Sequence, residues 1–169
     1  MNTGQMMLAA GALVLLGTTV ITVDRMFGNQ GTILRQTEIG VYAISLGTSI
    51  LEEAQGMNFD EVTVNNAITS TSSLTAASSL GPESGETTTP ASSTKFDDFD
   101  DYNNLTEGLQ VAGVDSFTVK ISVYYVNDSA PDTKVTTPTW YKRMDLKITS
   151  TAMTDTVKMS YIFSYFNFR

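Results

Sequence analysis

The sequence predicts an α+β fold in which a long N-terminal α-helix packs on a three- to four-stranded antiparallel β-sheet. Apolar residues at the N-terminal end recur at helical spacing, and the C-terminal third alternates apolar and polar residues. A Ser/Thr-rich stretch separates the two patterns. We therefore expect an apolar helix, an amphipathic continuation of it, a loop and a sheet, with boundaries at 1–27, 28–57, 58–108 and 109–169.

The first element is a candidate membrane span. No charged side chain occurs before Asp24, and residues 6–23 read MMLAAGALVLLGTTVITV. As an α-helix this run covers about 27 Å, close to the thickness of the hydrocarbon core of a bilayer. A secretory signal peptide would need a basic start and a small-residue cleavage site, which this segment lacks. A buried core helix would need more surrounding protein than the rest of the chain supplies.

Residues 33–57 continue with apolar residues at helical spacing. One apolar face is formed at intervals of three and four by Ile39, Ala43, Leu46, Ile50, Ala54 and Met57. Val41, Ile44 and Leu51 begin a second apolar face. Two such faces predict two partners, the sheet of the same domain and copies of the same chain. Gly28 and Gly31 loosen the connection, so two separate helices are the alternative.

The middle of the chain predicts a polar surface loop. Fifteen of the 26 residues from 69 to 94 are Ser or Thr, which can pack almost no core. An acidic run follows, and residues 52–107 hold eleven acidic side chains against one lysine. Carboxylates in a flexible loop suit calcium, although the spacing is not that of an EF-hand. The calcium candidates are Asp97, Asp98, Asp100 and Asp101, and a solvated acidic surface is the alternative.

The C-terminal third predicts an antiparallel sheet with one covered face. Apolar residues alternate with polar ones in three stretches, 117–125, 140–148 and 157–165, and residues 109–111 are a possible fourth strand. The segments 127–132 and 150–155 are rich in turn-forming residues and join these strands. The helix face described above is the expected cover. Ile162, Phe166 and Phe168 lie on the other face of the last strand, where we expect a neighbouring subunit.

Composition excludes several classes of function. The chain has no Cys and no His, so it offers no thiolate nucleophile, no imidazole base and no Cys or His metal ligand. Its net charge of −8 is unsuited to nucleic acid, which attracts basic surfaces. We therefore expect neither an enzyme nor a cofactor, and no nucleic-acid partner.

The order of the parts resembles the type IV pilin family over the whole chain. The local similarity is greatest in AISL at 43–46, LEEA at 51–54 and MNFDE at 57–61. The resemblance implies a structural subunit of an extracellular helical filament at the cell surface, held together by its N-terminal apolar helices. It also implies removal of a short basic leader by a prepilin peptidase, which explains the uncharged start at Met1.

The resemblance further implies partners and assembly residues. The partner is the chain itself in a homopolymer, preceded by the inner membrane and the pilus assembly machinery. The residues expected in assembly are Met1, Gln5, Leu8, Leu13, Leu16, Val20, Ile39, Leu46 and Ile50. Gln5 replaces the glutamate usual in the family, and the family's disulfide-closed loop is absent. The alternatives are a minor pilin or pseudopilin of a secretion system, and a single-pass membrane-anchored surface module that does not polymerise.

Overall fold

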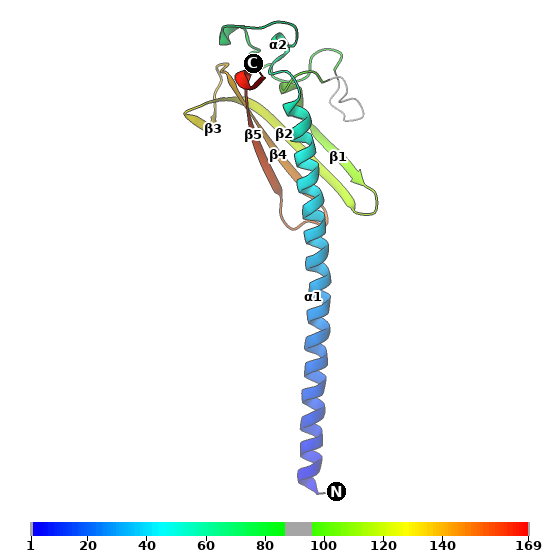
Figure 1. Ribbon diagram of the computed structural model, residues 1–169. Coiled ribbons are helices and arrows are strands. Elements are labelled where there is room, and N and C mark those ends of the chain that lie inside the picture. The colour runs from blue at the N-terminus through cyan, green and yellow to red at the C-terminus, as the bar shows by residue number, and fades with distance from the viewer. Residues whose placement is uncertain (1, 87–95, 169) are drawn as a thin grey trace. The chain divides into compact units, whose positions relative to one another are not determined.

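The computed structural model describes residues 2–86 and 96–168 (Figure 1). The chain divides into two compact units, Met1–Glu38 and Ile39–Arg169. Helix α1 (Thr3–Gln55) supplies all of the described secondary structure of the first unit and enters the second. The sheet and the shorter helices belong to the second unit.

Helix α1 passes through Gly28 and Gly31 without interruption, so the alternative of two separate helices is not observed. It ends before Gly56, whose N–H donates to Glu53 O at 3.0 Å in a final tight turn. The backbone of Gly56 is not left-handed, so the helix ends here without the conformation that specifically requires glycine. The helical periodicity of the sequence therefore gives one continuous element.

The sheet is antiparallel, with strand order β1-β2-β4-β5 and with β3 paired to β2 outside this path. Its strands are β1 (Thr106–Val111), β2 (Asp115–Asn127), β3 (Ala130–Lys134), β4 (Tyr141–Ser150) and β5 (Val157–Ser164). The alternation in β2 is confirmed, since its apolar residues from Phe117 to Tyr125 are buried and most of those between them are exposed. Strand β3 arises where a turn alone was expected, because the chain folds back after Asn127 and pairs with the end of β2.

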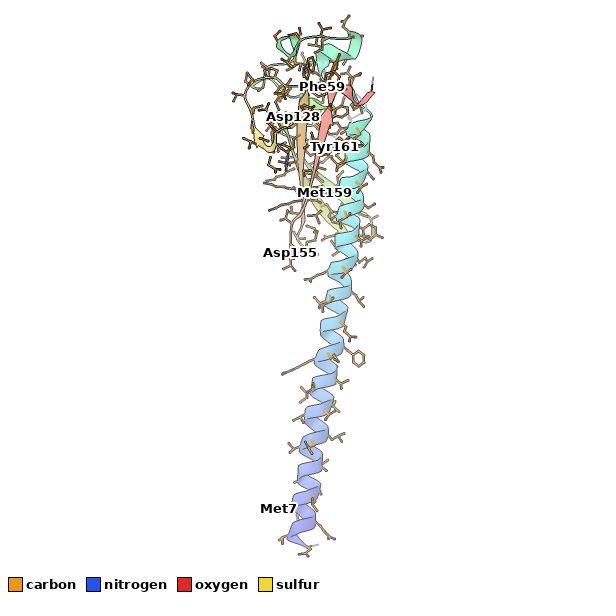
Figure 2. The ribbon with its side chains drawn as sticks, turned by 60° about the vertical axis from the view of Figure 1, so that its left-hand side comes forward. Met7, Phe59, Asp128, Asp155, Met159 and Tyr161 are labelled. Carbon is orange, nitrogen blue, oxygen red and sulfur yellow. The ribbon has the colours of Figure 1, made fainter. Side chains whose placement is uncertain are left out.

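The C-terminal part of α1 covers one face of the sheet, which confirms the predicted fold class (Figure 1). Ile39, Ala43 and Ala54 are fully buried in the same core as the apolar face of β2. Gly47 allows the close approach, because a Cβ there would lie 2.5 Å from Met159 Sδ and 2.9 Å from Ile148 Cδ1. Met159 is on β5 beside the helix (Figure 2).

The segment between helix and sheet is more structured than a surface loop. It contains α2 (Glu61–Asn65) and the 3₁₀ turns η1 (Thr71–Ser73) and η3 (Asp100–Tyr102). Leu74 and Leu80, within the Ser/Thr-rich stretch, are buried in the core. The few apolar residues of a polar segment thus anchor it to the domain. The part of the stretch from 87 to 94 lies outside the described residues.

The last predicted strand is shorter than expected. It ends at Ser164, and Tyr165–Phe168 form the 3₁₀ turn η4. The rings of Trp140 and Tyr165 stack with centroids 5.0 Å apart, and this packing draws the chain out of the strand. Phe166 is therefore exposed in a turn and not on the other face of β5, and the side chain of Phe168 lies outside the described residues.

Candidate functional site

The first candidate site is the apolar surface of α1 in the first unit. Of the predicted assembly residues, Leu8, Leu13, Leu16 and Val20 are 59–77% exposed. Gln5 is also exposed, and Met1 lies outside the described residues. Exposing such side chains to water costs about 25 cal/mol per Å² of apolar surface. Covering this surface with lipid or protein would remove that cost.

The threonine hydroxyls at positions 18, 19 and 22 have acceptors within the helix. Thr18 and Thr19 donate their hydroxyls to Leu15 O at 2.9 and 2.8 Å, and Thr22 donates to Thr18 O at 2.8 Å. Hydrocarbon provides no hydrogen-bond partners, so an internal partner for each hydroxyl suits a membrane environment. The helix is long and apolar enough to cross a membrane, and none of its most apolar 18-residue window is buried.

Three predicted assembly residues lie in the second unit. Ile39 is fully buried against its own domain, so its assignment to contacts between subunits is wrong. Leu46 and Ile50 are half-buried and pack on the same core. Of the second predicted face, Val41 and Ile44 are exposed, whereas Leu51 is buried. The helix face at 39–54 is thus occupied mainly by its own sheet.

The second candidate site is a buried charge cluster around Lys142 on β4. The Lys142 side chain has no exposed surface, and its ammonium donates to Phe59 O at 2.7 Å, to Asp60 Oδ2 at 2.8 Å and to Asp100 Oδ1. It also lies 4.8 Å from the centroid of the Phe59 ring. Three acceptors match the three N–H donors of an ammonium, so this buried cation is fully satisfied.

Asp60 connects this lysine to the surrounding loop. It is the N-cap of α2, and its carboxylate accepts from Tyr125 Oη at 3.0 Å and from Thr75 Oγ1 at 3.0 Å. Burial alone would raise the pKa of Asp60, but attraction and hydrogen bonding from Lys142, with hydrogen bonds from Thr75, lower that pKa below its ordinary value. Asp60 is therefore a structural anion that ties the loop to the sheet.

The acidic run is buried, so the expectation of a solvated acidic surface is wrong for three of its members. Asp98 and Asp100 have no exposed surface, and Asp101 is 1% exposed. Asp98 Oδ1 accepts the backbone N–H groups of Asp100 and Asp101 at 2.7 and 3.2 Å. Asp101 Oδ2 accepts those of Asp97 and Asp98 at 3.0 and 3.2 Å. One carboxylate oxygen of Asp98 and one of Asp101 thus stabilise the turn at 97–101 by accepting backbone hydrogen bonds.

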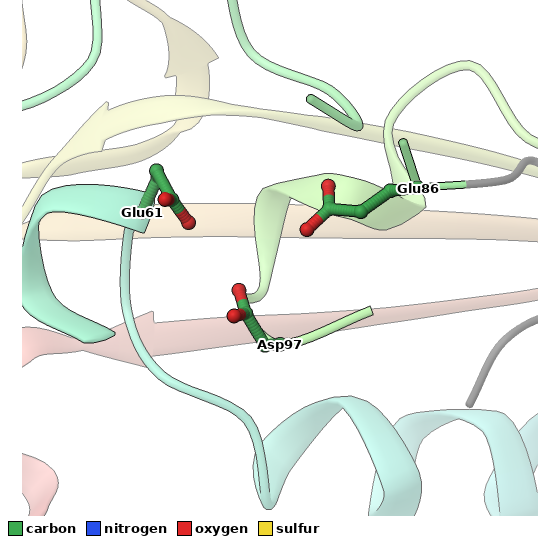
Figure 3. Close-up of side chains that lie close together, drawn as sticks. All are labelled: Glu61, Glu86 and Asp97. Carbon is green, nitrogen blue, oxygen red and sulfur yellow. The ribbon is translucent and has the colours of Figure 1, made fainter. Parts of the chain in front are cut away.

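The second carboxylate oxygen of Asp98 and of Asp101 accepts no hydrogen bond from the part of the chain that the structure describes. Asp97 Oδ1, Asp98 Oδ2 and Asp101 Oδ1 are buried and have no hydrogen-bond partner among the described residues. Three glutamates from elsewhere in the loop, Glu61, Glu83 and Glu86, lie close to these aspartates. Figure 3 shows two of them, Glu61 and Glu86, together with Asp97. Ligand oxygens lie within 4.8 Å of one another in three overlapping groups: Glu61, Glu86 and Asp97; Glu61, Glu83 and Asp98; and Glu83, Glu86 and Asp101.

This crowding raises the proton affinity of the carboxylates. Burial, with the charge of Asp100 added to it, raises the pKa of Asp98 to about 10. Burial raises the pKa of Asp101 to about 7 and, with hydrogen bonding to Glu86, that of Glu83 to about 8. The cluster therefore holds its negative charge only at a cost, which protons or a cation would relieve.

The sequence pattern missed parts of this cluster. Alternate residues of a strand point to the same face, so Lys142 shares a face with Trp140 and Met144. The alternation could therefore have predicted that Lys142 lies on the covered face of β4. Glu61, Glu83 and Glu86 carried no such signal, because nothing local places them beside residues 97–101. Asp100, one of the four calcium candidates, is instead an ion-pair partner of Lys142.

No family model, no curated protein and no solved structure matches the chain in these comparisons. The two candidate sites are therefore assigned from the residues of this chain alone. Together they define an α+β domain with an N-terminal helix that is long and apolar enough to anchor it in a membrane.

Proposed function

We propose that the chain is a structural subunit of a type IV pilus-like extracellular filament, assembled by packing of its N-terminal apolar helices. The exposed apolar surface of α1 carries this proposal. It combines a span of membrane length with self-satisfied threonine hydroxyls, and it is joined to a domain with a complete core of its own. Before assembly, the same helix would hold the subunit in the inner membrane.

The physical basis is an exchange of lipid for copies of the same helix. In a bilayer the backbone of a helix is satisfied internally and its side chains are surrounded by hydrocarbon. Outside the membrane the same side chains would face water, so packing them into a helix bundle removes that cost. A head-to-tail interface that does not close produces a helical filament instead of a ring.

The glycines of the span support close helix packing. A Cβ at Gly4, Gly11 or Gly17 would meet nothing within 4 Å in the chain, so no intramolecular contact requires a glycine there. Glycine also lowers helix propensity by about 1 kcal/mol relative to alanine. Small residues allow helices to approach closely in apolar surroundings. Helices of neighbouring subunits are the partners that would use this space.

Leu16→Lys tests the proposal directly. A lysine at the centre of the span costs roughly 3 kcal/mol in a bilayer and leaves an unpaired charge in a helix bundle. We expect filaments visible by negative-stain microscopy to be lost in a strain expressing this variant, while Leu16→Met keeps them. Immunoblots of membrane fractions establish whether the variant is inserted.

Normal filament yield from an inserted Leu16→Lys variant would contradict a helix-bundle core. Absence of filaments from the unaltered protein, with the protein retained in the membrane fraction, would favour the anchored surface module. A low copy number in isolated filaments would favour a minor pilin, a class to which Gln5 is suited.

A further inference from the structure

The loop between α1 and the sheet concentrates negative charge that its described side chains do not balance. Eight carboxylates gather there, and Lys142 is the one ammonium that contacts them within residues 2–86 and 96–168. That ammonium is used by Asp60 and Asp100. The remaining six are Glu61, Glu83, Glu86, Asp97, Asp98 and Asp101.

Two of these six, Asp98 and Asp101, each carry one carboxylate oxygen that is unpartnered within the described part of the chain, at a fully or almost fully buried position. Asp98 has no exposed surface and Asp101 is 1% exposed, yet Asp98 Oδ2 and Asp101 Oδ1 have no donor among the described residues. Ligand atoms of Asp98 lie within 4.8 Å of those of Glu61 and Glu83. A buried carboxylate oxygen without a partner loses its hydration without compensation. A cation bound among the neighbouring carboxylates would provide that compensation.

We propose that calcium binds among these six carboxylates, whose ligand oxygens meet in three overlapping groups of three. Calcium takes six to eight oxygen ligands in flexible geometry, and carboxylates from several chain segments provide them. Magnesium requires near-ideal octahedral geometry and keeps its water, which suits a crowded and largely buried cluster less well. The ligand set contains oxygen alone, so it does not favour zinc, which prefers nitrogen and sulfur.

Calcium at this position would connect three segments of the loop. Glu61 begins α2, Glu83 and Glu86 lie within the Ser/Thr-rich stretch, and the aspartates precede β1. Within the structure, the 83–86 turn is closed by a hydrogen bond from Glu83 N to Glu86 Oε2 at 2.7 Å. A shared cation adds bonds between this turn and the buried residues at 97–101. The site stands whether or not the chain polymerises.

The experiment uses the full-length chain in detergent, stripped of metal with a chelator and then dialysed. Thermal unfolding followed through the fluorescence of Trp140, the one tryptophan, is measured with no metal, with 1 mM CaCl₂ and with 1 mM MgCl₂. We expect calcium to raise the midpoint by at least about 4 °C, and magnesium to raise it by less than half as much. Calorimetric titration of CaCl₂ into the stripped protein measures the affinity.

The matched variants are Glu83→Gln with Glu86→Gln, against Glu107→Gln as control. Glu107 is also half-buried and carries a raised pKa, but it lies on β1 and does not belong to the cluster. We expect the double variant to fold and to bind calcium at least about tenfold more weakly, and the control to bind as the unaltered chain does. No calcium-dependent shift in the unaltered chain, an equal shift with magnesium, or equal binding by all three proteins would overturn the proposal.

Discussion

At the residue scale, Lys142 connects three segments of the second unit. Its ammonium joins a strand of the sheet to the segment at 59–60 and to the turn at Asp100. A buried ion pair contributes little net stability compared with an apolar replacement of both partners. Removing one partner is different, because the remaining buried charges then have no compensation. Loss of Lys142 is therefore expected to destabilise the domain mainly because Asp60 and Asp100 would be buried without a counter-ion. The strength of each individual hydrogen bond is the smaller effect.

Lys142→Met tests this argument at the residue scale. We expect the free energy of unfolding to fall by about 3–5 kcal/mol, because Asp60 and Asp100 would remain buried without their counter-ion. Urea unfolding of the full chain in detergent, followed through Trp140 fluorescence, measures the change. Lys147→Met is the control, since Lys147 is exposed on the same strand. An equal effect of the two substitutions would contradict the role assigned to Lys142.

The carboxylates predict a distinctive pH dependence for the metal-free protein. Raised pKa values of about 8 for Glu83 and about 7 for Asp101 mean that the folded state binds protons more tightly than the unfolded state. Stability should therefore rise as the pH falls from about 9 to about 5. Asp60 acts in the opposite direction, because its lowered pKa gives stability that is lost only below its ordinary pKa of 3.8.

Thermal midpoints of the chelator-treated chain between about pH 9 and about pH 3 measure this profile. We expect a maximum at about pH 4 and a decline on both sides. Asp101→Asn should flatten the alkaline side, since an amide has no proton to gain. A midpoint that stays constant between pH 9 and pH 5 would contradict the crowding of charge described above.

At the scale of elements, Gly47 allows a close approach between α1 and the sheet. Gly47 faces β4 and β5, where a Cβ would come too close to Ile148 and Met159. Gly40, two turns earlier in the same helix, has nothing within 4 Å of the corresponding position. The two glycines therefore differ in their surroundings although they share one helix and one backbone conformation.

Alanine substitutions separate these two environments. Gly40→Ala should raise the free energy of unfolding by up to about 1 kcal/mol, because alanine favours the helix. Gly47→Ala should lower it, because the overpacking cost of about 1–3 kcal/mol exceeds that gain. Urea unfolding of both variants gives the comparison. Equal stabilisation by the two substitutions would show that the helix does not approach the sheet as closely as described.

At the scale of the whole molecule, the exposed apolar surface of the first unit and the core of the second unit are formed by different residues. The second unit has its own core, which begins at Ile39. The apolar residues before it are exposed and contribute nothing to that core. Folding of the domain and association through the helix are thus expected to be independent properties.

Deletion of residues 1–27 tests this independence. The truncated chain should be a soluble monomer by sedimentation and should form no filaments, because the apolar surface is removed. Its thermal midpoint should match that of the domain in the full chain, since the core from Ile39 onwards is retained. Long filaments from the truncated protein would contradict the proposed function, and loss of the thermal transition would contradict the independence of the domain.

Local patterns in the amino-acid chain were enough to predict the helix, the main strands and the face that each buries. Periodicities of 3.6 and 2 arise from backbone geometry within a few residues, and they do not depend on distant neighbours. The expectation for Ile39 failed because the pattern marks an apolar face without saying which partner covers it. The pairing of β3 with β2 was missed because a polar turn sequence carries no apolar alternation.

The carboxylate cluster depends instead on folding. Glu61, the pair Glu83 and Glu86, and residues 97–101 belong to three segments of the chain, and folding brings their carboxylates together. Burial and charge at that site are collective properties, since each carboxylate acquires its environment from the others and from Lys142. Local patterning therefore sufficed for the elements, whereas the environment of the charged groups was set by long-range packing.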